Sequence, residues 1–210
     1  AYLGQTATLQ IVDSLSNTGG GAWSHILVDE IVLTDVAFPH PAPSFAITNT
    51  LLNLPVSVGA TSHRVTLMVG TNIVRDFNIE LATGGATPDW WAFVDISAFQ
   101  GQTGTLLLDT QPTSTAFVNS LVFTNGLLGA TNLYQESLRP QLHFSTKRGW
   151  LNDANGMVYY NGQYHLYYQH DPFNWDGSGP KWWGHAVSSD MVNWQESQEG
   201  IYSHVYGDDV

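Results

Sequence analysis

Residues 150–156 read WLNDANG and place one carboxylate, Asp153, between two asparagine amides and near a tryptophan. Asn, Asp and Gly favour turns, so we expect a tight turn with Asp153 at its mouth and with Asn152 and backbone amides donating hydrogen bonds to it. An ionised carboxylate of this kind can act as a nucleophile, and an aromatic side chain can form a wall for a sugar ring. These are the groups that a glycoside-cleaving site needs. The alternative is an Asx-type turn, in which Asp and Asn satisfy their own backbone.

The charge balance narrows the class of partner. Acidic residues outnumber basic ones 18 to 6, which gives a formal net charge of −12. Binding to nucleic acid requires clustered Lys and Arg, so we expect no nucleic-acid partner. No apolar run is long enough to cross a membrane, and we expect no membrane insertion.

Cysteine and histidine usage limits the chemistry further. The chain has no cysteine, which excludes a disulfide framework and a thiol nucleophile. Its eight histidines are scattered, without the spacing of a zinc site, and we expect neither a metal nor another cofactor.

The pattern of apolar residues predicts an all-β fold. Short apolar or alternating runs recur between Gly, Pro, Asn and Asp along the chain. Asn161 and Gly162 stand between two aromatic-rich runs and predict a two-residue β-hairpin turn. The expected strands of the C-terminal third are residues 157–160, 164–169, 184–189 and 193–197, which fit one blade of a β-propeller.

Two further runs, YHLYYQ at 164–169 and WGHA at 183–186, accompany the WLNDANG stretch. Together they resemble the start of the catalytic domain of glycoside hydrolase family 32, the invertases, inulinases and levanases. The resemblance implies a β-sandwich N-terminal module followed by the first blade of a five-bladed β-propeller, truncated after residue 210. We expect four segments: closing strands of a preceding β-sandwich-like module (1–35), a small β-sandwich (36–126), a linker (127–140) and the N-terminal part of the propeller (141–210).

The resemblance also assigns roles to residues. It implies that Asp153 attacks the anomeric carbon of a β-fructofuranoside and forms a covalent fructosyl-enzyme, with overall retention. Asn152, Gln169 and Trp175 match positions that bind the sugar. The family has proline where this chain has Ala154. Losing proline frees the backbone there but leaves the carboxylate in place.

The remaining aromatic residues divide between sugar binding and packing. Trp90 and Trp91 are adjacent in an expected strand, so their side chains point to opposite faces and at least one of them belongs to the core. We expect Trp183 to fill the core of the blade, and the sequence does not decide where Trp182 lies. We expect His185 to be a structural histidine rather than a base.

Retaining hydrolysis needs a second carboxyl group about 5–5.5 Å from the nucleophile. In the family, a Glu-Cys motif supplies this acid and an Arg-Asp-Pro motif stabilises the transition state, and neither motif occurs here. Four acidic residues near the C-terminus are available, but none of them lies in a matching motif: Glu196, Glu199, Asp208 and Asp209. The chain is therefore expected to be part of a larger enzyme, to need the remainder of the catalytic domain as its partner, and to be inactive alone.

The expected function is that of a retaining β-fructosidase acting on levan, inulin or sucrose outside the cell or at its surface. A fructosyltransferase of the same fold would form the same covalent intermediate and differ only in the acceptor. A carbohydrate-binding fragment without turnover is the third hypothesis.

Overall fold

The computed structural model describes residues 43–202 except 110, 113 and 114. All of these belong to one compact unit, His40–Val210. Within the described residues, the non-strand elements are helix α1 (Thr115–Ser120) and two 3-10 turns, η1 (Ser97–Phe99) and η2 (Ala130–Asn132). The all-β prediction is confirmed. The strands predicted in residues 1–35 lie outside the described residues, and the predicted domain boundaries stay predictions.

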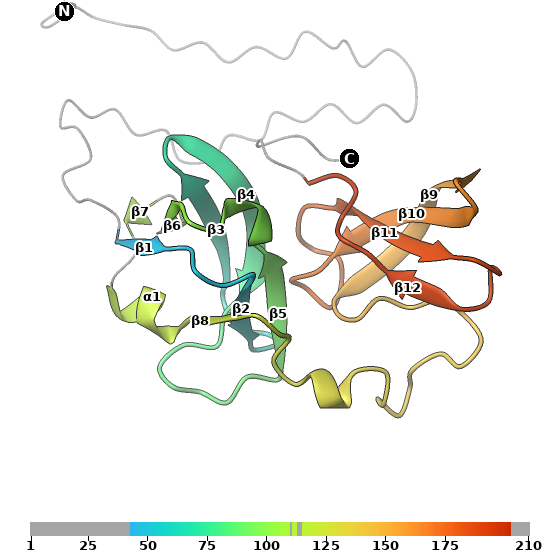
Figure 1. The fold of residues 1–210 in the computed structure, drawn as a ribbon. Helices are drawn as coiled ribbons and strands as arrows, with labels where there is room; N and C mark the ends of the chain where they lie inside the picture. The colour runs from blue at the N-terminus through green and yellow to red at the C-terminus, as the bar shows by residue number, and fades with distance from the viewer. Residues whose placement is uncertain (1–42, 110, 113–114, 203–210) are drawn as a thin grey trace, which may run out of the picture. The chain divides into compact units, whose positions relative to one another are not determined.

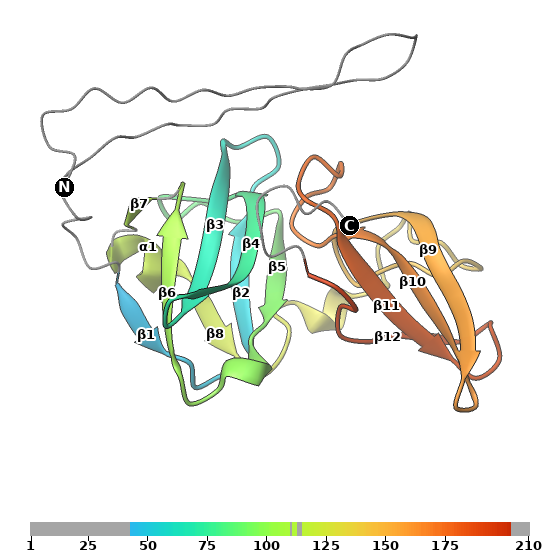
Figure 2. The ribbon, with the colours of Figure 1, turned by 90° about the horizontal axis from the view of Figure 1, so that it is seen from above.

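The first half of this unit consists of two antiparallel sheets, which we call the sandwich (Figures 1 and 2). One sheet has the strand order β1-β6-β3-β4, with β7 also paired to β6. Its strands are β1 (Ser44–Ala46), β3 (Ser62–Val69), β4 (Asn72–Glu80), β6 (Thr103–Leu108) and β7 (Gln111–Pro112). The other has the order β5-β2-β8. Its strands are β2 (Leu51–Val56), β5 (Trp90–Asp95) and β8 (Val122–Thr124).

Alternating apolar side chains hold the two sheets of the sandwich together. Leu67 from β3 and Phe77 from β4 are buried in the same cluster as Leu52 from β2 and Val94 from β5. Successive side chains of a strand point to opposite faces, so each strand contributes every second residue to this core. The arrangement fits the β-sandwich expected from the sequence.

The second half of the unit contains a four-stranded antiparallel sheet, which we call the blade sheet (Figure 1). Its order is β12-β11-β10-β9. The strands are β9 (Trp150–Tyr160), β10 (Gln163–Asp171), β11 (Trp182–Ser188) and β12 (Trp194–Glu196). All four predicted strands are confirmed, although β9 begins seven residues before the predicted start. The hairpin prediction is also confirmed, because Asn161 and Gly162 join β9 to β10 with φ values of 50° and 81°. The number of blades stays a prediction.

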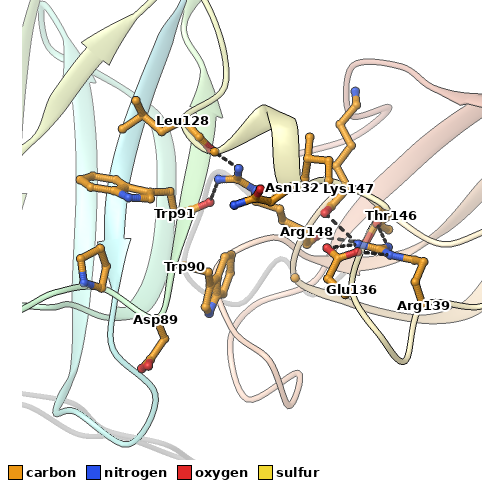
Figure 3. A pocket seen from close by; sticks show the side chains of 14 residues that line it. Asp89, Trp90, Trp91, Leu128, Asn132, Glu136, Arg139, Thr146, Lys147 and Arg148 are labelled. Carbon is orange, nitrogen blue, oxygen red and sulfur yellow. Dashed lines mark hydrogen bonds and ion pairs between the residues drawn. The ribbon is translucent and has the colours of Figure 1, made fainter.

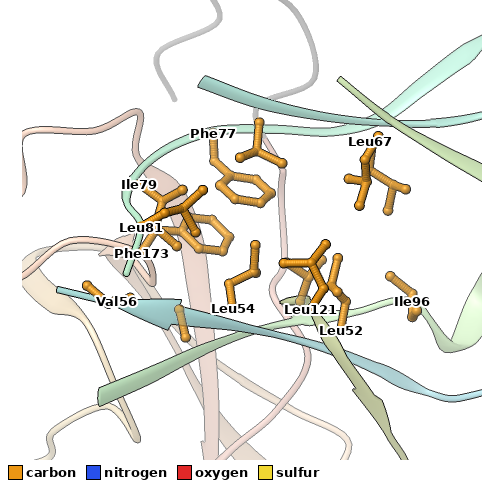
Figure 4. Close-up of a cluster of buried hydrophobic side chains, with 14 of the residues drawn as sticks. Leu52, Leu54, Val56, Leu67, Phe77, Ile79, Leu81, Ile96, Leu121 and Phe173 are labelled. Carbon is orange, nitrogen blue, oxygen red and sulfur yellow. The ribbon is translucent and has the colours of Figure 1, made fainter. Parts of the chain in front are cut away.

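Aromatic side chains join the blade sheet to the sandwich. Phe173, which follows β10, stacks on Phe77 of β4 with 3.7 Å between ring centroids (Figure 4). Trp182 of β11 packs edge-on against Phe173 at 5.0 Å. Asn174 Nδ2 donates a 3.0 Å hydrogen bond to the carbonyl of Asn78 in β4. Trp183, which was predicted to fill the core of the blade, is half-buried, whereas Trp182, whose place the sequence left undecided, is buried. The core that receives Trp182 is the one shared with the sandwich.

We predict that Phe173→Ala lowers the free energy of unfolding by about 3–5 kcal/mol, because it removes a fully buried ring and leaves a cavity. Chemical denaturation of the purified chain measures this loss. Leu142→Ala is the control, since Leu142 is 93% exposed and its truncation should change stability by less than about 0.5 kcal/mol. Equal effects of the two substitutions would contradict this account of the core.

Candidate functional site

Asp153 lies within strand β9. The register of β9 with β10 places Asn152 and Asp153 together opposite the single residue Gln169, which defines a β-bulge. The pairs on either side are Leu151–His170 and Ala154–Tyr168. The predicted tight turn is wrong, because β10 pairs along residues 150–160 and the extra residues of β9 are absorbed by this bulge and by a second register shift at Asn155. A bulge re-aims side chains, and here Asn152 and Asp153 share the position opposite Gln169.

The two predicted sugar-binding amides contact each other across the strands. Asn152 Nδ2 donates a 3.0 Å hydrogen bond to Gln169 Oε1. This bond occupies one end of each amide. Among the described residues, Asn152 Oδ1 and Gln169 Nε2 have no protein partner, which leaves one acceptor and one donor for a ligand.

Asp153 itself is exposed to solvent. Within the part of the chain that the structure describes, its carboxylate makes no side-chain hydrogen bond or ion pair. The expectation that Asn152 donates to Asp153 is wrong, since the Asn152 amide is directed to Gln169. The Asp153 carboxylate is therefore accessible to a ligand beside a preformed amide pair.

Trp150 supports the loop that carries Trp175. A Cβ atom at Gly177 would come within 2.7 Å of the Trp150 ring, so the loop passes directly over that ring and requires glycine there. Lys181 Nζ lies 5.3 Å from the centroid of the same ring, a cation–π distance. Trp150 is half-buried by these contacts, whereas Trp175 is 58% exposed. Of the two, Trp175 is the aromatic surface open to a ligand.

Asp171 organises this loop and was missed by the sequence reasoning. Its buried carboxylate accepts hydrogen bonds from the backbone amides of Phe173 (3.1 Å), Asn174 (3.2 Å) and Gly179 (2.9 Å), and from Asn174 Nδ2 (3.0 Å). Burial raises the pKa of Asp171, and these hydrogen bonds oppose the shift. An Asp that ends a strand and directly precedes a proline, here Pro172, is an Asx-turn signal that could have identified it.

The acids Glu196 and Glu199 lie away from Asp153. Glu196 pairs with Ala186, and Ala186 pairs with Leu166, so these three side chains share one face of the blade sheet. Leu166 and Gln169 are three residues apart on one strand, so Gln169 projects from the other face.

Glu196 accepts a 2.6 Å hydrogen bond from the backbone amide of Lys147, and burial raises the pKa of Glu196.

Glu199 is the partner of a buried histidine, His170, which lies on the same face of β10 as Leu166 and opposite to Gln169. His170 Nδ1 lies 2.7 Å from Glu199 Oε1, and His170 Nε2 lies 2.9 Å from the carbonyl of Arg148. Burial by itself lowers the pKa of His170, but the Glu199 carboxylate and the two hydrogen bonds outweigh it and raise the pKa to about 9. A protonated His170 donates to both oxygens. This pair supports the structure and does not face Asp153.

His185 is held by its neighbours, as expected for a structural histidine. Its ring stacks on Tyr167 at 4.5 Å, and its Nε2 lies 3.0 Å from His165 Nδ1. Burial and the neighbouring His165 both lower the pKa of His185.

Among the described residues, no group of three or more His, Asp or Glu side chains is arranged to hold a metal ion. None of the helices in that part of the chain is long and apolar enough to cross a membrane.

Comparison with known proteins finds a family that the blade sheet resembles. The family model described as the glycosyl hydrolases family 32 N-terminal domain matches residues 143–209, which include the four strands β9–β12. Residues 143–209 are therefore similar to this domain, and we call them the family-32 segment. The matched residues contain Asp153, Asn152, Gln169 and Trp175.

Relatives of this family-32 segment have fructan-related names. A levanase of Bacillus subtilis is 49% identical over 72 residues, which are 34% of this chain and 10% of the relative. An extracellular exo-inulinase of Aspergillus niger is 40% identical over 89 residues, which are 40% of this chain and 16% of the relative. The chain therefore spans a small part of the length of the relatives that it matches.

One solved structure is also similar. A glycoside hydrolase family 32 protein from Bifidobacterium adolescentis matches 74% of this chain and 27% of its own, at 21% identity and a TM-score of 0.33. At that score, the superposition supports no structural conclusion.

We predict that Asp171→Asn loosens the Trp175 loop of the family-32 segment, because an amide in place of the carboxylate loses acceptors for the loop donors. Amide hydrogen exchange at Gly179 should accelerate about tenfold or more. Asp176→Asn is the matched control in the same loop, since Asp176 is exposed and accepts from the Ser178 amide alone among the described hydrogen bonds. Unchanged protection of Gly179 in Asp171→Asn would show that the carboxylate does not hold the loop.

The raised pKa of His170 predicts a pH-dependent stability. The folded pKa of about 9 exceeds the ordinary 6.5, so the stabilisation is complete below about pH 6.5 and is lost as the pH rises through 9. The free energy of unfolding should fall by about 3 kcal/mol across this window. Denaturant titrations of the native chain and of His170→Gln at several pH values measure it. The same decline in both proteins would exclude His170 as its cause.

Proposed function

We propose that this chain belongs to a retaining β-fructosidase that releases fructose from levan, inulin or sucrose, with Asp153 as the nucleophile. The main support for this proposal is the position of Asp153 in the family-32 segment. Asp153 is exposed, and it lies on a bulge next to the hydrogen-bonded pair of Asn152 and Gln169. The names levanase, exo-inulinase and fructan beta-fructosidase among the relatives support a fructan substrate. The names of the exo-inulinases also support an extracellular location.

In the proposed reaction, an Asp153 oxygen attacks the anomeric carbon of the fructosyl unit as the bond to the leaving-group oxygen breaks. A second carboxyl group gives its proton to that oxygen. The same group then takes a proton from water, which attacks the fructosyl ester and releases fructose with its original configuration. Two inversions at one carbon produce the retention.

The amide pair and Trp175 would hold the fructosyl unit. Asn152 Oδ1 accepts from a sugar hydroxyl and Gln169 Nε2 donates to another, since their mutual hydrogen bond leaves these two groups for the ligand. Trp175 offers an exposed ring to the apolar face of the sugar. Asp171 is a positioning residue, because it acts through the loop.

The acid is proposed to come from the remainder of the catalytic domain. Glu196 projects from the opposite face of the blade sheet, and Glu199 is paired with His170. Retention places the partner carboxyl group about 5–5.5 Å from Asp153. The purified 210-residue chain is accordingly expected to release no measurable fructose from levan. Robust fructose release by this chain would refute the proposal that the acid lies in the remainder of the catalytic domain.

In the complete enzyme, Asp153→Ala should lower kcat by about 10⁴-fold or more, while binding of a short fructan is retained. Steady-state kinetics and calorimetric binding measure the two quantities. Asp176→Ala is the control, because it removes an exposed carboxylate from the neighbouring loop and should leave kcat within about threefold. Normal turnover by Asp153→Ala would eliminate Asp153 as the nucleophile.

A further inference from the structure

A cavity of about 410 Å³ lies in the part of the molecule that Figure 3 shows. Strand β5 of the sandwich, the segment around η2 and the residues just before β9 form its walls. Its volume is within the range of about 300–1,000 Å³ typical of small-molecule sites. Asp153, Gln169 and Trp175 are not among its lining residues.

The aromatic wall of this cavity comes from Trp90 and Trp91, both half-buried. Trp90 also packs against the apolar cluster of the sandwich, which restrains its ring. Figure 3 shows the Trp91 ring pointing away from the charged pair Glu136 and Arg139. The carbonyl of Trp91 accepts a hydrogen bond from Arg148. Trp90 is therefore the restrained aromatic surface on the side of the charged pair.

Glu136 and Arg139 form a two-pronged ion pair at the cavity wall. Arg139 Nε donates to Glu136 Oε2 at 2.9 Å, and Arg139 Nη2 donates to Oε1 at 2.7 Å. The other guanidinium donors reach Ser145 Oγ and the carbonyls of Thr146 and Lys147. A guanidinium has five N–H donors, so these bonds use all of them. The hydrogen bonds from Arg139 lower the pKa of Glu136 to about 2, which keeps its carboxylate ionised as an acceptor.

The other cations of the cavity are also bound to protein oxygens. Arg148 donates to the carbonyls of Trp91 and Leu128. Lys147 Nζ lies 3.4 Å from the carbonyl of Glu196. The lining carries three cations (Arg139, Lys147 and Arg148) and two carboxylates (Asp89 and Glu136), so its charges nearly balance and favour a ligand without strong charge.

We propose that this cavity binds a neutral oligosaccharide at a site separate from Asp153. The ring of Trp90 contacts the apolar face of a sugar, the Glu136 carboxylate accepts from its hydroxyls, and the exposed Asn132 amide can donate and accept. A chain with this second site would hold a polymeric substrate at raised local concentration. The proposal stands on the cavity and does not require Asp153 to be catalytic.

The test uses the 210-residue chain carrying Asp153→Ala and Trp175→Ala, which removes the nucleophile and the exposed aromatic of the first site. Calorimetric titration with a short levan oligosaccharide, and separately with a maltose-series oligosaccharide, should detect saturable binding of at least one. Asn132→Ala and Trp90→Ala should each weaken that binding, the tryptophan variant by about tenfold or more. Circular dichroism and the melting temperature verify folding of each variant, and Asn132→Ala provides a mild test because its side chain is exposed.

Each outcome decides the matter. Binding that is lost in folded Asn132→Ala or Trp90→Ala supports the site, and the sugar that binds identifies its class. Absence of binding by both sugars overturns the proposal, as does binding that both substitutions leave unchanged. Competition by inorganic phosphate at matched ionic strength would overturn the assignment of a neutral ligand. Failure of these tests would leave the loss of turnover in Asp153→Ala unaffected, so the two proposals fail separately.

Discussion

The pairing of β9 with β10 is the constraint on which the rest of the family-32 segment depends. The extra residues in β9 are absorbed by two register shifts, and one of these is the bulge that sets Asn152 and Asp153 opposite Gln169. At the end of the same pairing, Trp150 lies opposite Asp171, so the ring under the loop and the carboxylate that organises the loop are neighbours. One register of backbone hydrogen bonds thus brings together the proposed nucleophile, the amide pair and the support for Trp175. A one-residue slip would send these side chains to the other face of the sheet.

The two faces of β10 have different tasks. One face carries Gln169, and the proposed chemistry takes place there. The other carries His170, whose contacts with Glu199 and the Arg148 carbonyl are buried. The end of β10 leads into Phe173, which stacks on the sandwich. The sandwich therefore shares an apolar core with the strand that positions the proposed site, and stability and site geometry are linked through the same few residues.

Much of this fold could be predicted because its signals are local. Asn161 and Gly162 tolerate the positive φ values that a two-residue hairpin requires, and their turn was found from those two residues. The bulge around Asp153 could not be found in this way, since WLNDANG has the composition of a turn and becomes a strand only through pairing with a distant partner. The place of Trp182 could not be decided from the sequence for a similar reason, because the core that buries it includes the sandwich. The proposed roles of Asp153, Asn152, Gln169 and Trp175 came from the family resemblance, to which the structure adds the amide pair.

The most direct test of the central claim is to identify the residue that carries the covalent sugar. The complete enzyme is mixed with a fructan, quenched with acid during turnover, digested and mapped by mass spectrometry. Our account predicts one fructosyl group on the peptide that contains Asp153, attached to that carboxylate, and no adduct in Asp153→Ala. A fructosyl group on another carboxylate, or an undiminished adduct in Asp153→Ala, would contradict it.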